Sequence, residues 1–237
     1  MKMKLAMLAI ATFTFAGCGG GGSSGSSEPT ATTYPALAAM ESAYTNGMQT
    51  TLNVTGTANN GTTSYPVTGA LTFTLGKVTN STFNGSSALQ STGSITGSLT
   101  LNGQNVPFNS SSLGYLNAQY VPIGSSTTGS YCVSTAIGSY PANATAGQTG
   151  ELTTFACYTD STKSVSTGGQ KQSYVTTAGS AFNTLDIKVL SSIYDSSNKV
   201  TASGSTTYTI TSTGAPKLSR FEFIATTNGV TLSFVGQ

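Results

Sequence analysis

The chain has 237 residues and a formal net charge of +2, and only 7% of its residues are charged. Lys2 and Lys4 account for the excess, since the 9 basic residues minus these two equal the 7 acidic residues. No basic patch is then left to neutralise phosphates, so the composition argues against nucleic acid as a partner. The chain also has no histidine, which excludes serine–histidine and cysteine–histidine nucleophiles and histidine zinc sites.

The N-terminus has the layout of a secretory signal peptide. Residues 1–4 carry two lysines, residues 5–16 form an apolar run, and Ala16 and Gly17 are small. The run is too short for a permanent membrane span, which needs roughly 20 apolar residues. We therefore expect residues 1–17 to be a signal peptide.

The four residues at the end of this segment carry a family resemblance. Phe15-Ala16-Gly17-Cys18 resembles the lipobox of bacterial lipoproteins, in which Leu usually stands at the position of Phe15. The resemblance implies a diacylglyceryl thioether on Cys18, cleavage before Cys18 and acylation of its freed amine, so that the membrane is a partner. Because Gly19 follows where an Asp would resemble a retention signal, it implies a bacterial cell envelope protein, in the outer rather than the inner membrane.

Residues 18–33 read as the lipidated cysteine followed by a flexible Gly/Ser-rich linker, since they show no apolar periodicity. No second linker or run of charge interrupts residues 34–237, so we expect one domain there. Leu37, Met40, Tyr44 and Met48 recur at helical spacing before or around Asn46-Gly47, which predicts a helix of about three turns that packs on a sheet.

The rest of the domain alternates like β-strands. Apolar residues share one parity over residues 65–75, and Asn102-Gly103 stands between two alternating runs, as in a tight hairpin. Four further runs over residues 185–234 predict a meander. The expected fold is all-β, a single antiparallel rolled meander sheet or barrel with one short N-terminal helix. A two-sheet β-sandwich is the alternative.

Cys132 and Cys157 remain once Cys18 is assigned to lipid, and both lie in strand-like stretches. An exported domain meets an oxidising compartment, so we expect these two cysteines to form a disulfide. Two thiols without histidine or a CxxC spacing make a poor metal site, and we expect neither a metal nor another cofactor.

The remaining residues offer little for catalysis. Ser196-Ser197-Asn198-Lys199 has the S-x-x-K spacing of serine acyl-enzymes but lies in a predicted turn, and residues 140–150 form a long irregular stretch near Tyr131, Tyr140 and Tyr158. These tyrosines fit either core packing or an aromatic contact surface. The carboxylates past the linker show no paired spacing: Glu41, Glu151, Asp160, Asp186, Asp195 and Glu222.

Three functions are compatible with these observations. The first is a membrane-anchored, non-enzymatic envelope lipoprotein that acts as an interaction or structural module. The second is an apolar-ligand or lipid carrier with a curved sheet, by analogy of fold. The third is a carboxylate-based hydrolase, for which the sequence gives the least support. The partner beyond the membrane is an envelope protein, a glycan or an apolar ligand, and no catalytic residue is predicted.

Overall fold

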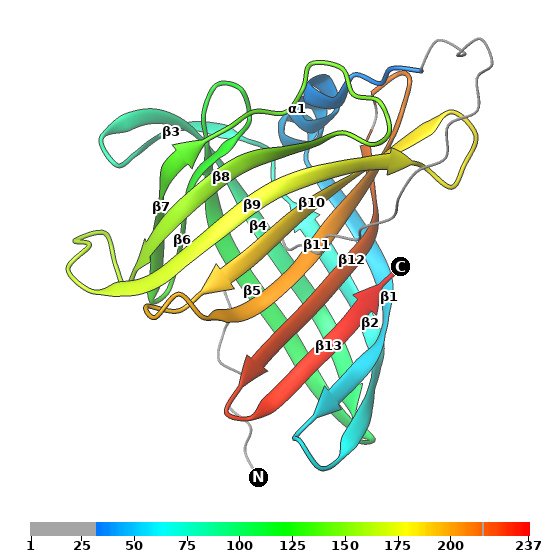
Figure 1. Ribbon diagram of the computed structural model, residues 1–237, viewed down its shortest axis with the longest axis vertical. Coiled ribbons are helices and arrows are strands. Elements are labelled where there is room, and N and C mark those ends of the chain that lie inside the picture. The colour runs from blue at the N-terminus through cyan, green and yellow to red at the C-terminus, as the bar shows by residue number, and fades with distance from the viewer. Residues whose placement is uncertain (1–31, 215) are drawn as a thin grey trace, which may run out of the picture.

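A computed structural model describes residues 32–214 and 216–237 of the chain (Figure 1). The predicted signal peptide, Cys18 and all but the end of the predicted linker lie outside the described residues. Within the described part of the chain, no helix is both long and apolar enough to cross a membrane.

The described residues form one helix and thirteen strands. Their bounds are α1 (Ala36–Asn46), β1 (Met48–Asn59), β2 (Ser64–Leu75), β3 (Thr79–Phe83), β4 (Ser86–Leu101), β5 (Gln104–Leu116), β6 (Pro122–Thr127), β7 (Ser130–Ile137), β8 (Thr149–Tyr158), β9 (Ser166–Ala178), β10 (Thr184–Tyr194), β11 (Val200–Thr211), β12 (Pro216–Thr227) and β13 (Val230–Gly236). The all-β prediction is confirmed.

The strands form one antiparallel sheet that closes on itself. Its order is β2-β1-β13-β12-β11-β10-β9-β8-β7-β6-β5-β4-β3, and β4 also pairs with β2. Twelve strands therefore close a barrel, and β3 is an additional strand beside β4. The pairing of β2 with β4 ends at Leu75 and Gly93. Beyond that point β3 pairs with the same edge of β4, beginning with Thr79 and Gln90. The barrel is confirmed, and the two-sheet sandwich is wrong because every strand belongs to this one sheet.

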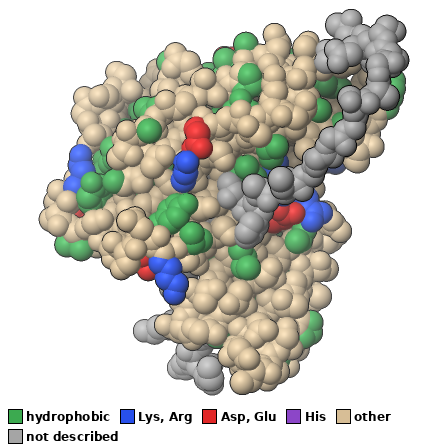
Figure 2. Space-filling view, in the orientation of Figure 1, with side chains coloured by type: hydrophobic (Ala, Val, Ile, Leu, Met, Phe, Trp, Pro, Cys, Tyr) green, Lys and Arg blue, Asp and Glu red, His purple; other side chains and the backbone are tan. Residues whose placement is uncertain are grey.

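Alternation of apolar and hydroxyl side chains gives the wall two different faces. In β1, Leu52, Val54 and Ala58 are buried, while the threonines between them are exposed. Successive side chains of a strand point to opposite faces, so the apolar set turns into the barrel and the threonines turn outward. On the face of the molecule shown in Figure 2, charged side chains are few and scattered.

Two-residue turns join several neighbouring strands. At Asn102-Gly103, between β4 and β5, φ is 49° and 72°, and at Asn228-Gly229, between β12 and β13, it is 50° and 74°. Positive φ at both central residues is the conformation that favours Asn-Gly, and its twist matches that of the flanking strands. Both turns occur where the sequence predicts them. The Asn84-Gly85 turn between β3 and β4 follows the same rule and was not predicted.

The helix and a long loop cover one mouth of the barrel (Figure 1). Helix α1 ends at Asn46, and Met48 already begins β1, so the predicted helix is confirmed with a shorter C-terminal end. The loop of residues 138–148 holds the start of the helix, since Tyr34 N donates to Ala144 O at 2.9 Å and Leu37 N to Pro141 O at 3.1 Å. Met40 and Tyr140 are buried together in the resulting cluster.

Cys132 and Cys157 face each other on β7 and β8 and form a disulfide, as the sequence predicts. Both cysteines are buried with Phe155. The bond joins two neighbouring strands of the barrel wall across a sequence separation of 25.

Candidate functional site

The lumen of the barrel contains a cavity of about 180 Å³ below α1. Met40 and Tyr44 of the helix and Tyr140 of the loop close it on one side, and inward side chains of the strands form its wall. An engineered apolar protein cavity of about 150 Å³ can bind benzene, so this volume is sufficient for a small ring-sized molecule.

The wall of the cavity is mainly apolar and aromatic. Its apolar and aromatic members are Met40, Tyr44, Met48, Phe73, Leu75, Ile95, Tyr115, Leu116, Tyr140, Phe155, Val189, Tyr208, Leu218 and Phe221. The aromatic side chains come from strands far apart in the sequence, and Phe73 and Phe221 lie with ring centroids 4.8 Å apart. Such a lining suits an apolar ligand, because it offers apolar contacts around most of the available space.

Three tyrosines that line the cavity have raised pKa values. Burial raises the pKa of Tyr44 to about 12, and it raises the pKa of Tyr208 further, with a contribution from the neighbouring Tyr44. Burial also raises the pKa of Tyr140 well above its usual value, with Tyr44, Tyr208 and Tyr174 contributing. Desolvation of these three side chains disfavours their ionised form.

Polar residues also line the cavity: two glutamines and the hydroxyl residues Thr74, Ser91, Ser94, Ser112, Ser125 and Thr206. Gln170 and Gln172 of β9 both point inward and line the cavity, and they are 6% and 7% exposed. The Gln170 amide donates to Ser191 Oγ on β10 at 2.8 Å. Gln172 Oε1 is buried without a hydrogen-bond partner. Neither glutamine was predicted as a site residue, and the one signal in the sequence is that both share the parity of Tyr174 on the same strand.

The six predicted carboxylates do not meet at the cavity. No Asp or Glu of the described residues lines it. Glu151 pairs with Lys171 at 2.9 Å, and Asp186 accepts a hydrogen bond from Thr209 Oγ1 on the neighbouring strand β11. Glu41 is exposed on α1. In the part of the chain that the structure describes, no group of three or more Cys, Asp or Glu side chains could hold a metal ion.

Two of the carboxylates cap their own turns, as expected for Asp in such segments. Asp160 accepts hydrogen bonds from the backbone and the hydroxyl of Thr162, which lower its pKa. Asp195 accepts from Ser197 N at 2.8 Å and Lys199 N at 3.0 Å. This second turn contains the S-x-x-K segment, which therefore lies in the β10–β11 connection and not at a helix start.

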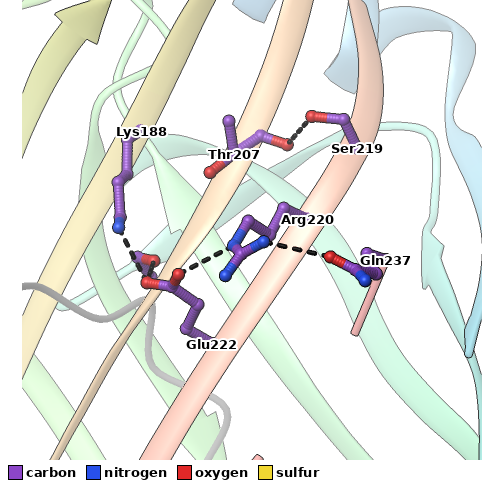
Figure 3. Close-up of polar contacts among 7 residues, drawn as sticks. Lys188, Thr207, Ser219, Arg220, Glu222 and Gln237 are labelled. Carbon is purple, nitrogen blue, oxygen red and sulfur yellow. Dashed lines mark hydrogen bonds and ion pairs between the residues drawn. The ribbon is translucent and has the colours of Figure 1, made fainter. Parts of the chain in front are cut away.

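Glu222 is the centre of a charged network on strands β10, β11 and β12 (Figure 3). Its carboxylate accepts from Lys188 Nζ at 2.7 Å, Arg220 Nε at 2.8 Å and Ser205 Oγ at 2.9 Å. Partial burial alone would raise the pKa of Glu222, but these hydrogen bonds outweigh it and lower the pKa to about 2. The network links three strands and keeps Glu222 ionised. A general acid would need a raised pKa, so the role that this geometry supports for Glu222 is structural.

The three tyrosines considered as a contact surface, Tyr131, Tyr140 and Tyr158, do not lie together. Tyr140 lies at the cavity, whereas Tyr131 packs on Phe83 with ring centroids 5.1 Å apart, and Tyr158 is half-buried opposite it on β8. The aromatic contact surface thus has one predicted member, Tyr140, and the other aromatic members come from strands and α1.

Comparison with known proteins finds no matching family model, no matching curated protein and no matching solved structure.

Proposed function

We propose that this protein is a lipid-anchored, non-enzymatic binding domain of the bacterial envelope, and that its barrel holds a small apolar molecule in the lumen. The observation that carries the proposal is the 180 Å³ cavity with its apolar and aromatic wall. Its volume is below the range of pockets that hold drug-sized ligands, so the proposed ligand is a ring-sized molecule rather than a whole lipid.

The charges support binding rather than catalysis. The carboxylates of the described residues lie outside the cavity, and most of them have hydrogen-bond or ion-pair partners of their own. Catalytic acids need positions beside a reacting atom and pKa values near the working pH. The lowered pKa of Glu222 moves it away from that range.

The anchoring part of the proposal rests on the resemblance of Phe15-Ala16-Gly17-Cys18 to a lipobox. Lipid on Cys18 would fix the protein to the membrane, with the outer membrane favoured by Gly19. The glycines and serines that follow would then act as a tether between the membrane and the barrel.

Methionine methyl groups provide a direct test of the lumen site. Met40 and Met48 both line the cavity and are the only methionines among the described residues. The purified protein, labelled with methyl-¹³C methionine and assigned with Met→Leu variants, is titrated with toluene. We expect the Met40 and Met48 signals to shift and saturate, and absence of any shift at the solubility limit of toluene would contradict the proposal.

A cavity-filling variant supplies the control. A Cβ built at Gly93 meets nothing closer than Ser112 Oγ at 3.8 Å, so a leucine there can extend into the lumen. We expect Gly93→Leu to fold and to lose toluene binding. The matched variant Thr92→Val changes the exposed neighbour on the outer face and should bind like the unaltered protein.

A second candidate function is docking of an envelope protein or glycan on the outer wall. It is favoured by the weakly charged exterior (Figure 2) and by the exposed threonines of β1. Crosslinking of the anchored protein in intact cells tests it, and a specific crosslinked partner that survives Gly93→Leu would favour this candidate over the lumen site.

A further inference from the structure

The side chain of Gln172 lines the cavity, and its amide oxygen is buried without a hydrogen-bond partner. Gln172 is 7% exposed, and among the described residues its Oε1 is the one buried side-chain oxygen or nitrogen that lacks a hydrogen-bond partner. An unsatisfied buried acceptor destabilises the folded state, and buried polar groups are paired in the great majority of cases. A hydrogen-bond donor at Gln172 Oε1 would therefore stabilise the protein, and the described residues do not provide one.

The hydroxyl residues paired with Gln172 on the two neighbouring strands do not bond its oxygen. Thr153 faces Gln172 across β8, and its hydroxyl donates to Ala136 O at 3.0 Å. On β10, Ser191 is the register partner of Gln172, and its hydroxyl oxygen accepts from the Gln170 amide at 2.8 Å, while no hydrogen bond joins it to Gln172 Oε1. The Gln170 amide nitrogen thus has a partner within the wall, whereas the Gln172 oxygen has none and could accept from a donor that a molecule in the cavity brings.

The rest of the lining restricts the charge of that molecule. No charged side chain of the described residues lines the cavity, and burial of an ion without a counter-charge is costly. The raised pKa values of Tyr44 and Tyr140 have the same physical origin, since both phenols are desolvated. A neutral ligand with a donor satisfies Gln172 Oε1 without placing a charge in the lumen.

We propose that the lumen binds a neutral alcohol or phenol, whose apolar body packs on the aromatic wall and whose hydroxyl donates to Gln172 Oε1. This inference rests on the proposed lumen binding and specifies the chemical class of the ligand. Its source of specificity is the acceptor, because a molecule of the same shape without a hydroxyl leaves Gln172 Oε1 unpaired.

The test compares two probes of similar size, phenol and toluene, by the same methionine methyl signals. Gln172→Met removes the acceptor and keeps the approximate volume of the side chain. We expect the affinity for phenol relative to toluene to fall about tenfold in this variant, which corresponds to the loss of one hydrogen bond. Gln49→Met, the same substitution at an exposed position of β1, should leave the ratio unchanged.

The possible outcomes distinguish the role of Gln172 from binding in the lumen as such. If neither probe shifts Met40 or Met48, lumen binding is wrong, and the ligand class is wrong with it. If both probes bind and Gln172→Met leaves their relative affinity unchanged, only the role of Gln172 is overturned.

Unfolding without ligand gives an independent measurement. An orphaned acceptor predicts that Gln172→Met unfolds at the same or a higher urea concentration than the unaltered protein. A lowered midpoint would mean that ordered water already satisfies Oε1, and it would overturn the inference.

Discussion

Lys188 of β10 and Glu222 of β12 form an ion pair across the intervening strand β11, with 2.7 Å between Lys188 Nζ and Glu222 Oε2. The strand between them contributes a third contact, because Ser205 Oγ donates to the same carboxylate oxygen. A single carboxylate therefore joins three neighbouring strands of the barrel (Figure 3).

Replacement of Glu222 by glutamine should destabilise the barrel near neutral pH. The pKa of Glu222 is lowered from 4.5 to about 2, and its side chain remains 24% exposed, so we expect a loss of about 1 to 2 kcal/mol after allowance for solvent screening. Urea unfolding at pH 7 measures it. Glu41→Gln, at an exposed position of α1, is the matched control and should have little effect.

The same contribution should disappear in acid. Because the pKa of Glu222 is lower in the folded state, its stabilisation is present above about pH 4.5 and is lost as the pH falls toward about 2. The difference in unfolding free energy between the unaltered protein and Glu222→Gln should therefore shrink over this interval. A difference that is constant from pH 7 to pH 2 would contradict the role of the ionised carboxylate.

Gly124 of β6 is expected to tolerate no side chain. A Cβ at this position would lie 2.0 Å from Phe83 Cε1 and 2.9 Å from Cys132 O, and the Phe83 ring already stacks on Tyr115 at 4.2 Å. Overpacking of this kind costs typically about 1 to 3 kcal/mol, so Gly124→Ala should lower the thermal midpoint clearly.

A second glycine of the lumen provides the comparison for Gly124. The nearest atom to a Cβ at Gly114 is Ser91 O at 3.8 Å, an ordinary contact, and Gly114→Ala should be close to neutral. The double variant Phe83→Leu with Gly124→Ala should lose less unfolding free energy than the two single variants together. The reason is that the Cβ at position 124 clashes with the Phe83 ring, which the double variant removes. Losses of unfolding free energy that simply add would show that the Phe83 ring does not limit the space at position 124.

The disulfide should contribute strongly to stability. Removal of a link that closes 25 residues costs about 3 kcal/mol in the chain-entropy description. We expect Cys132→Ser with Cys157→Ser, and also reduction of the unaltered protein, to lower the urea midpoint to a similar extent. Reduction that leaves the midpoint unchanged, or thiol labelling of both cysteines without reductant, would contradict the pairing.

Cys18 should carry the lipid. We expect Cys18→Ser to abolish incorporation of radiolabelled palmitate and to release the protein from the membrane fraction, because each acyl chain contributes about 0.8 kcal/mol per buried CH₂ to membrane affinity. The double variant of Cys132 and Cys157 should keep the label. Incorporation that persists in Cys18→Ser would refute the lipobox interpretation.

The strands and tight turns were predictable because their signals are local. The alternation over residues 65–75 indicates a strand with one buried face, and the Asn102-Gly103 pair selects a turn through its own backbone preferences. The pairing of Cys132 with Cys157 was predictable by elimination, since the resemblance to a lipobox assigned Cys18 to lipid and left two cysteines. The short strand β3 was missed, because its sequence Thr-Asn-Ser-Thr-Phe has one apolar residue and no alternation.

The composition of the cavity was not predictable in the same way. Phe73 and Phe221 are 148 positions apart in the sequence, and nothing near either residue specifies that their rings lie 4.8 Å apart. Gln172 looks like any polar strand residue until the partners of its neighbours are known. Whether a buried amide is satisfied depends on atoms from three different strands.

The strand alternation, the Asn-Gly turns, the pair of cysteines and the absence of histidine depend on neighbouring residues or on composition, so they could be predicted before the fold was known. Three features appear only in the folded chain: β4 pairs with β2 and closes the barrel, α1 and the loop of residues 138–148 cover one mouth, and Gln172, whose oxygen is unpaired, lines a mainly apolar cavity. The reason is physical: closure and burial are set by contacts between segments distant in the chain, and no short stretch of residues encodes them.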